Sequence, residues 1–151
     1  MTETMNITTR SGLAFTTDVD GPIGGPLVLM LHGFPESRHS WRAALRAAGA
    51  AIAATDAVIA GEVSNAFCSV RPPGHHATPS ASMGFCLFNN VAIAARHAMD
   101  VHGLSRIAIV DFDVHGCHGL SPRWNANPQN VVLAWKEVST RAAKPHMIMI
   151  I

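Results

Sequence analysis

The segment that most constrains this chain is Arg106 to Phe112, which contains four consecutive apolar residues, Ile, Ala, Ile and Val. Consecutive apolar residues place apolar side chains on both faces of a strand, so a short run of this kind predicts a strand buried on both faces, as in the parallel sheets of α/β proteins. A helix-like pattern from Phe88 to His102 precedes it, and alternation of helix and buried strand builds βαβ units. We therefore expect an α/β fold with a mainly parallel sheet and flanking helices.

The two flanking helices are predicted from their composition and periodicity. Ser40 to Ala60 is rich in the helix formers Ala, Leu and Arg. Phe88 to His102 has an apolar side and is followed by Gly103, a typical residue after a helix end. On this pattern His97 and His102 are solvated or helix-end histidines. The residues expected on the buried faces are Leu45, Ile52, Val58 and Ile59 in the first helix and Val91, Ile93, Ala94, Ala98 and Met99 in the second.

Three short strands are predicted outside this helix–strand unit. Leu27 to Leu31 is a continuous apolar run and predicts a buried strand. Asn65 to Val70 is predicted as a strand that Arg71-Pro72-Pro73-Gly74 ends. The alternating patch from Leu13 to Thr17 predicts an edge strand. His75 and the residue after it then lie on a loop at a strand end, where parallel α/β sheets place their sites.

The end of the apolar strand carries residues that suit a divalent metal. Asp113 and His115 are two positions apart, so on an extended strand end a carboxylate oxygen and an imidazole nitrogen point to the same side. Zinc accepts both kinds of ligand. Asp111 lies on that face too, and His75 and His76 offer adjacent imidazoles for acid–base chemistry beside a metal-bound water. Each motif alone is weak, because carboxylates after a strand often only cap the next turn.

Three ordered motifs together carry a resemblance to a known family. They are Arg71-Pro72-Pro73-Gly74-His75-His76-Ala77, the segment Met83 to Ala92 (MGFCLFNNVA), and Val110-Asp111-Phe112-Asp113-Val114-His115. In this order and spacing they resemble the histone deacetylase family, including its bacterial acetylpolyamine and deacetylase-like amidohydrolases. The resemblance covers about residues 46–134. It implies an arginase/deacetylase-like fold and metal-assisted hydrolysis of an acetyl-amide, with acetyl-lysine or an acetylated polyamine as the substrate.

The resemblance also implies roles for individual residues. Asp113 and His115 match two of the family's three zinc ligands. His75 and His76 match the tandem histidines that activate the metal-bound water and protonate the leaving amine. Asp111 matches the residue that orients His75, a contact that fixes the tautomer of a histidine and raises its basicity.

A substrate channel and a second ion follow from the same resemblance. Phe85, which follows Gly84, matches one wall of the narrow channel that holds the acylated side chain. Backbone carbonyls around Asp111, Asp113 and His115 match those that hold a potassium ion in the family. Zinc, with potassium as a structural ion, is therefore the expected cofactor set.

The sequence departs from the family pattern beyond His115. The family continues His-His-Gly-Asn/Asp-Gly, whereas this chain has His115-Gly116-Cys117-His118-Gly119. The family's third zinc ligand is an aspartate far downstream and its oxyanion is stabilised by a tyrosine, but this chain runs to Ile151 and contains no tyrosine. Two protein ligands make a weak zinc site. Cys117 and His118 are candidate substitutes for the third ligand, and we expect a truncated site whose activity is open.

A second resemblance covers about residues 10–45. Pro26 to Arg42 contains His32-Gly33-Phe34-Pro35 after an apolar run, and this resembles the start of an α/β-hydrolase of the epoxide hydrolase type. The match implies that Phe34 supplies a backbone N–H to an oxyanion hole. A hydrolase also needs a nucleophile elbow, and the chain contains no Gly-x-Ser-x-Gly. The nearest segment, Gly116 to Gly119, is more simply a tight turn with an incidental cysteine.

The two resemblances predict a fused organisation. We expect an α/β-hydrolase-like N-terminal segment at residues 1–45, a truncated deacetylase-like core at 46–134 and an unassigned C-terminal segment at 135–151. The chain ends in an apolar run from His146 to Ile151. Such a run would be an aggregation-prone edge if unpaired, so a homo-oligomer is one way to cover it.

Composition excludes several classes of partner. Only 14% of the residues are charged, and Lys and Arg do not cluster, so nothing indicates a nucleic-acid or anionic membrane surface. The three cysteines have no paired spacing, which favours a reducing compartment. No apolar run is long enough to cross a bilayer and the first ten residues are polar, so we expect a cytoplasmic protein.

Three functional hypotheses remain at this point. The first is a zinc-dependent, deacetylase-like amidohydrolase acting on acetyl-lysine or a small acetylated amine. The second is an esterase or epoxide hydrolase of the α/β-hydrolase type. The third is a non-catalytic fragment produced by truncation or fusion.

Overall fold

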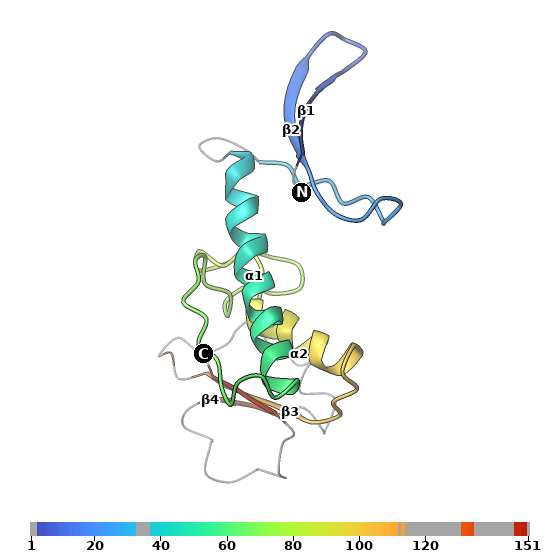
Figure 1. Ribbon diagram of the computed structural model, residues 1–151. Coiled ribbons are helices and arrows are strands. Elements are labelled where there is room, and N and C mark those ends of the chain that lie inside the picture. Colours follow the sequence, from blue (N-terminus) through green and yellow to red (C-terminus); the bar gives the residue numbers. More distant parts are fainter. Residues whose placement is uncertain (1–2, 33–36, 112, 114–130, 135–146, 151) are drawn as a thin grey trace. The chain divides into compact units, whose positions relative to one another are not determined.

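The computed structural model describes residues 3–32, 37–111, 113, 131–134 and 147–150 (Figure 1). The elements in chain order are β1 (Glu3–Thr8), β2 (Ala14–Val19), α1 (Arg38–Ile59), α2 (Asn90–Asp100), β3 (Ile107–Asp111), β4 (Val131–Ala134) and β5 (Met147–Ile150). The chain divides into two compact units, Met1–Arg42 and Ala43–Ile151. The predicted division at residues 45 and 134 rests on family resemblance and stays a prediction.

The first unit is built on a β-hairpin. β1 pairs antiparallel with β2, with Glu3 opposite Val19 and Thr8 opposite Ala14. The turn uses Gly12 at a φ of 86°, and Thr9 N–H donates to Leu13 O at 2.8 Å. The predicted strand at Leu13 to Thr17 is found as β2, whereas β1 was not predicted. Apolar side chains of the hairpin, including Met5, Ile7 and Phe15, are exposed within this unit.

The predicted buried strand at Leu27 to Leu31 is wrong. This segment has no regular secondary structure, and Leu27 is 94% exposed. A strand requires a neighbouring backbone that accepts its N–H groups and donates to its carbonyls. One hydrogen bond that reaches this segment comes from a side chain, from Trp41 Nε1 to Leu31 O at 3.1 Å.

A three-stranded sheet forms the base of the second unit. β3 is its central strand, with β4 and β5 paired in parallel on either side. Ala108 lies opposite Val131 in β4 and Ile148 in β5. The strand predicted at Arg106 to Phe112 is thus found as β3. Its residues Ile107 and Ile109, which share one face of the strand, are fully buried.

Small residues form the buried faces of both helices. The residues buried in α1 are Ala44, Ala47, Ala48 and Thr55, and those in α2 are Asn90, Ala94, Ala95 and Ala98. Both helices were predicted close to their observed bounds, but Leu45, expected on the buried face of α1, is 46% exposed. Alanine leaves no long side chain between backbones, so this stripe admits closer packing than the leucine position would.

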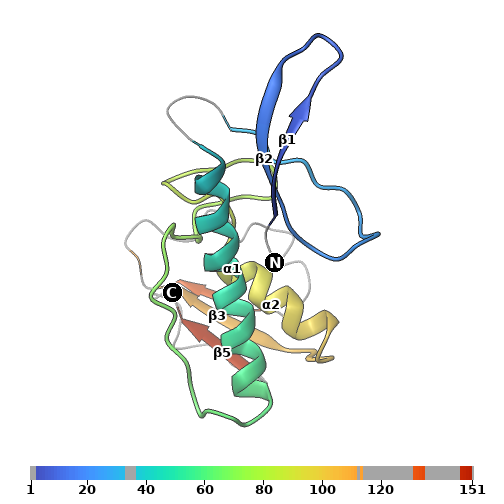
Figure 2. The same cartoon turned by 45° about the horizontal axis from the view of Figure 1, so that its top comes forward.

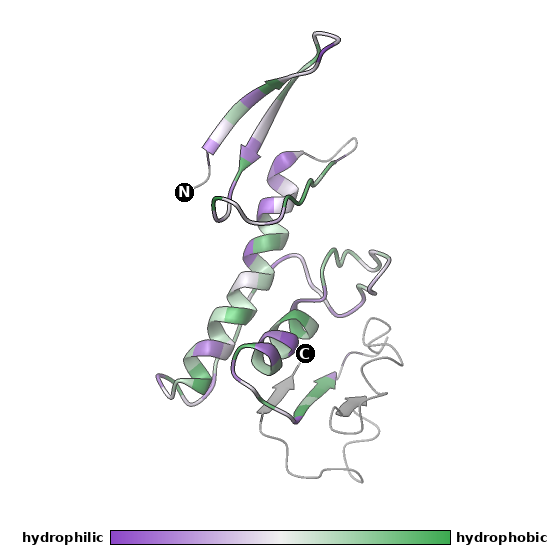
Figure 3. Ribbon diagram, turned by 90° about the vertical axis from the view of Figure 1, so that its right-hand side faces the viewer, coloured by the Kyte–Doolittle hydropathy of each residue, from purple (hydrophilic) through white to green (hydrophobic). Residues whose placement is uncertain are grey.

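The core of the second unit lies between α2 and β3. Ala95, Ala98, Ile107 and Ile109 are buried together, and Ile59 at the end of α1 packs against them. Both helices therefore cover the same side of the sheet (Figure 2). Figure 3 shows β3 as hydrophobic along most of its length. Neither described helix combines the length and apolar character that crossing a bilayer requires.

The segment between the helices is a long loop. Asn65 to Val70 was predicted as a strand, but it has no strand pairing and this prediction is wrong. Its residues Phe67 and Asn65 are exposed, and Cys68 Sγ donates to Ala50 O at 3.6 Å. The loop is therefore held by side-chain contacts rather than by a sheet.

Candidate functional site

The loop that carries the tandem histidines is fastened to the start of α2 by two asparagines. Asn90 Nδ2 donates to Pro72 O at 3.2 Å, and Asn89 Nδ2 donates to Ala77 O at 3.2 Å. A weaker bond of 3.5 Å joins Asn89 Nδ2 to His75 O. Asn89 also caps the helix, because its Oδ1 accepts a hydrogen bond from Ala92 N at 3.1 Å. The same side chain thus starts α2 and positions the histidine loop.

Gly74 allows this loop to approach the helix closely. A Cβ at this position would lie 2.5 Å from the backbone nitrogen of Asn90 and 2.9 Å from Phe88 O. Both atoms belong to the main chain and cannot turn away. The glycine before His75 is therefore required by backbone contact rather than by a special φ angle.

His75 and Asp111 form a buried pair. His75 Nδ1 lies 3.0 Å from Asp111 Oδ2, and the two side chains are 10% and 0% exposed. Asp111 is the last residue of β3, whereas His75 comes from the loop before α2. The other carboxylate oxygen of Asp111 accepts from the backbone N–H of Asp113 at 2.9 Å. Asp111 thus joins the end of the strand to the tandem-histidine loop.

His76 lies beside His75 and against a glycine. The two imidazole centroids are 4.0 Å apart, with ring planes inclined by 33°. Gly84 has a φ of 53°, and a Cβ on it would lie 2.3 Å from Cδ2 of His76. Phe85, the next residue, also has a positive φ of 63° and is 93% exposed. Two successive residues in the left-handed region therefore turn the chain sharply beside His76.

The remaining predicted site residues divide between described and undescribed positions. Asp113 is described, and it is exposed at the end of β3. His115, Cys117 and His118 lie outside the described residues, as does Phe34 of the predicted oxyanion hole. The structure thus brings together His75, His76, Gly84 and Asp111, with Asp113 joined to Asp111 through its backbone.

This arrangement is suited to proton transfer. A carboxylate at Nδ1 holds the imidazole of His75 in the tautomer that carries its proton there, so Nε2 is the nitrogen that can accept a proton from a reacting group. The start of α2 adds a positive helix dipole near the loop, which favours negative charge developing beside it.

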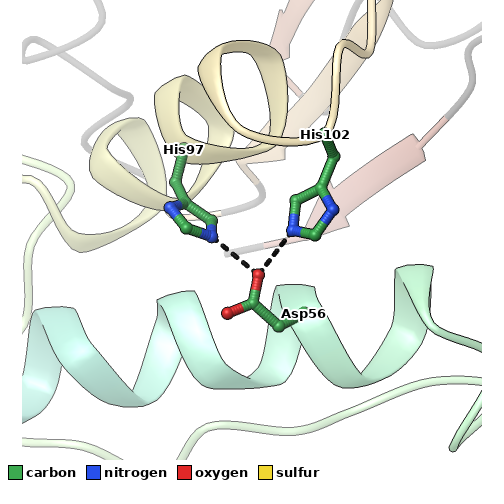
Figure 4. A group of neighbouring side chains, drawn as sticks. All are labelled: Asp56, His97 and His102. Atoms are coloured by element: carbon green, nitrogen blue, oxygen red, sulfur yellow. Dashed lines mark hydrogen bonds and ion pairs between the residues drawn. The ribbon is translucent and has the colours of Figure 1, made fainter.

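A second histidine–aspartate group lies at the other end of α2, and the sequence analysis missed it. His97 Nε2 and His102 Nε2 each lie 2.6 Å from Oδ1 of Asp56 on α1 (Figure 4). The predicted solvated, helix-end role of these histidines is corrected in part, since their side chains are 21% and 26% exposed and both bind Asp56. Hydrogen bonds from His102 and His97 lower the pKa of Asp56 below 3.8, its ordinary value. Asp56 is distant in sequence from both histidines, so no local spacing signals the group.

Comparison with known proteins identifies the family of the chain. A family model described as the histone deacetylase domain matches residues 16–135. The match begins inside the segment of about residues 10–45 for which we predicted an α/β-hydrolase resemblance. That second resemblance stays a prediction, whereas the deacetylase resemblance is confirmed at the level of the family.

Three curated relatives illustrate the range of the match. The chain is 48% identical over 101 residues to "Polyamine deacetylase HDAC10" of Mus musculus, covering 67% of this chain and 15% of the relative. It is 52% identical over 89 residues to "Histone deacetylase 14, chloroplastic" of Arabidopsis thaliana, covering 56% and 21%. It is 51% identical over 80 residues to "Histone deacetylase-like amidohydrolase" of Pseudomonas aeruginosa, covering 53% and 21%. The matched region thus spans about a fifth or less of the length of these relatives.

Proposed function

The chain belongs to the histone deacetylase family, and from this premise we propose that it is a zinc-dependent, deacetylase-type hydrolase that removes acetyl groups from acetyl-lysine or an acetylated polyamine. The observation that supports the proposal most directly is the buried contact between His75 Nδ1 and Asp111 Oδ2 at 3.0 Å. An aspartate that fixes the tautomer of one of two adjacent histidines is what acid–base hydrolysis of an amide requires.

Within this proposal, each described residue has one task. Asp111 is a positioning residue that holds the proton of His75 on Nδ1. His75 Nε2 then accepts the proton of the attacking water, and His76 donates a proton to the nitrogen of the leaving amine. The water supplies the oxygen of the released acetate, so the amide is hydrolysed without another reactant. Gly84 lets the ring of His76 lie in place, because any Cβ there would overlap Cδ2.

The metal ligands in this proposal are Asp113 and His115. Their carboxylate and imidazole match zinc in kind, and the bond from Asp113 N to Asp111 Oδ1 joins the backbone of Asp113 to the carboxylate that contacts His75. Bound zinc would polarise the acetyl carbonyl and lower the pKa of its water. Cys117 or His118 is proposed as the third protein ligand. A potassium ion on the neighbouring backbone carbonyls is the second proposed ion.

The proposal extends to fold, substrate path and location. We assign the second unit to an arginase/deacetylase-like fold with a mainly parallel sheet, with the deacetylase-like core at about residues 46–134. Phe85 is 93% exposed, which suits a channel wall that a substrate side chain can reach. The substrate class is a small acetylated amine or an acetyl-lysine peptide, and the proposed location is the cytoplasm.

The α/β-hydrolase alternative has less support. It depends on residues 10–45, where the strand expected to precede His32 is absent and the family match already begins at residue 16. It stays a prediction, distinguished by an activity that chelation does not affect.

The test is deacetylation by the purified chain with an acetyl-lysine peptide and with an acetylated polyamine, before and after chelation and with zinc restored. We expect activity that is lost on chelation and recovered with zinc, and that Asp113→Ala abolishes together with zinc binding at this motif. His39→Gln, on an exposed histidine of α1, is the matched control and should leave the rate unchanged.

Two results would overturn the proposal. Activity that survives both chelation and Asp113→Ala would rule out the metal mechanism. A folded, zinc-saturated chain with no rate on either substrate or on an activated aryl acetate would show that the chain is not catalytic.

A further inference from the structure

The group of Asp56, His97 and His102 brings three ligand-type atoms to one point. His97 belongs to the last turn of α2, and His102 follows the end of that helix. Both Nε2 atoms face the same carboxylate oxygen of Asp56 (Figure 4). The atoms that could bind a metal, one from each of the three residues, all lie within 4.8 Å of one another. The imidazole centroids are 5.4 Å apart and the ring planes are inclined by 75°. The rings therefore converge on Asp56 through their nitrogen edges rather than by stacking.

The electrostatic surroundings of this group favour a cation. Asp56 lies in the last turn of α1, where the helix dipole disfavours a carboxylate. No basic residue occupies the last turn of that helix. His97 marks the C-terminal turn of α2, so the negative ends of two helices converge at one carboxylate. A divalent cation placed between the three side chains would offset all of these negative charges and partial charges.

The group is accessible from solvent but not fully hydrated. Its side chains are 46%, 21% and 26% exposed for Asp56, His97 and His102. Ile59, one helical turn beyond Asp56, packs against the core formed by α2 and β3. The backbone that carries the carboxylate is therefore fixed, while the three side chains retain room to adjust.

We propose that Asp56, His97 and His102 form a binding site for a divalent transition-metal ion of the zinc type, at the opposite end of α2 from the tandem histidines. Two imidazoles and one carboxylate are a common zinc ligand set and leave a fourth position for water. Zinc bonds of about 2.0–2.2 Å place neighbouring ligand atoms roughly 3.3 Å apart. Each nitrogen thus needs to move by about 0.7 Å from Asp56 Oδ1, which small side-chain rotations provide.

Bound metal would link the end of α1 to the end of α2. The role inferred for this site is structural, because the ion would replace two hydrogen bonds with three coordinate bonds between the helices that cover the sheet. A ligand that binds only the folded chain raises its melting temperature with concentration. This inference is independent of the proposed deacetylase activity, because it uses none of the residues assigned to that reaction.

The experiment begins from a background that lacks the family metal motif. Asp113→Ala, His115→Ala, Cys117→Ser and His118→Gln remove the side chains proposed to hold catalytic zinc and leave Asp56, His97 and His102 intact. Zinc alone is the probe. Equilibrium dialysis gives the stoichiometry, and thermal unfolding with and without a chelator gives the shift in Tm. We expect one zinc per chain and a Tm that rises with zinc and falls on chelation.

Two further variants in this background separate a metal site from a hydrogen-bonded contact. The double variant His97→Gln/His102→Gln keeps N–H donors for the carboxylate, and Asp56→Asn keeps an oxygen acceptor, but both lose ligand atoms suited to zinc. We expect each to weaken zinc binding at least about tenfold and to abolish the zinc-dependent shift in Tm. His39→Gln is the control and should retain both.

Each alternative outcome decides against the site. A background chain that is folded but binds no zinc overturns the proposal. A zinc equivalent that persists in the His97→Gln/His102→Gln variant with an unchanged shift in Tm places the metal elsewhere and also overturns it.

Discussion

The two histidine–aspartate groups lie at opposite ends of α2 and differ in how they are built. At the start of the helix, His75 and Asp111 are buried, and their loop is fixed by the close backbone approach at Gly74 and by the Asn89 side chain, which donates to the backbone of Ala77. At the end of the helix, Asp56 is half-exposed and is held by two imidazoles that come from one short segment. The loop of the first group is packed closely against the backbone of α2, whereas the second group is held by contacts between side chains.

This difference separates two uses of the same chemistry. A buried pair with a defined tautomer is suited to moving one proton along a fixed path. A half-exposed group of two imidazoles and a carboxylate can open around an ion that arrives from solvent. The helix dipole enhances the contrast, because its positive end lies at the first group and its negative end at the second. The following substitutions test the comparison, in order of decreasing expected effect.

Gly74→Ala should have the largest effect on stability. The added methyl group would lie 2.5 Å from the backbone nitrogen of Asn90, so the loop must move away from α2. We expect a loss of roughly 3 kcal/mol in the free energy of unfolding, at the upper end of overpacking costs. Urea denaturation measures it. Gly49→Ala, at a helix position with nothing within 4 Å, is the control and should be neutral or stabilising. Equal effects of the two substitutions would show that the loop is not locked by backbone.

Asp111→Ala should destabilise the chain more than Asp56→Ala does. Removing Asp111 leaves His75 Nδ1 and the backbone N–H of Asp113 without their buried acceptor, at a cost of about 2 kcal/mol. Water can replace the half-exposed Asp56 carboxylate, so its removal should cost less. Parallel denaturation curves in the presence of a chelator give both values. The opposite order would refute the contrast between a buried and a side-chain-held group.

Asn89→Ala should have a smaller effect, confined to the start of the helix. It removes the cap that accepts from Ala92 N and the donor to Ala77 O. We expect a loss of about 1 kcal/mol, typical of an N-cap substitution. Amide hydrogen exchange should show faster exchange in the loop before α2 and unchanged exchange around His97. If protection were lost equally at both ends, the two groups would not be independent.

Asp18→Asn should have the smallest effect on the free energy of unfolding. Because no histidine contacts Asp18 in the interactions that lower its pKa, it serves as a reference for the pH dependence of the two histidine–aspartate groups. Hydrogen bonding from Thr4, followed by Arg38, lowers the pKa of Asp18 below its ordinary value of 3.8. Its stabilising contribution is therefore present above about pH 4 and is lost as the pH falls through the lower, folded-state pKa. The difference in urea midpoint between the variant and the natural chain should shrink only in that acid range. A difference that already changes near neutral pH would contradict this assignment.

The sequence predicted one of these groups and missed the other for a physical reason. The motifs around His75 and Asp111 are contiguous and typical of a family, so their meeting follows once the helix and strand between them are assigned. Asp56, His97 and His102 meet only because α1 packs beside α2, and no single segment contains the pattern. The bounds of α1 and α2 were predicted closely, but the periodicity of a helix does not identify the element against which it packs.

The strand predictions show the same limit. The buried strand at Arg106 to Phe112 was recognised because Ile107 to Val110 are apolar without interruption. Leu27 to Leu31 is also apolar without interruption but is not a strand, because a strand also needs a partner that local sequence does not supply. Apolar runs therefore predict burial only where the topology provides a neighbouring strand or helix.

The position of β3 in its sheet has a consequence for biosynthesis. Both of its partners, β4 and β5, are translated after it, and Ile107 pairs with Met147. At about 5–20 residues per second, β5 emerges roughly two to eight seconds after β3. During that interval the backbone edges of β3, which carries four consecutive apolar residues, are open to other nascent chains. Synthesis of this protein should therefore depend on chaperones that shield extended hydrophobic segments during translation.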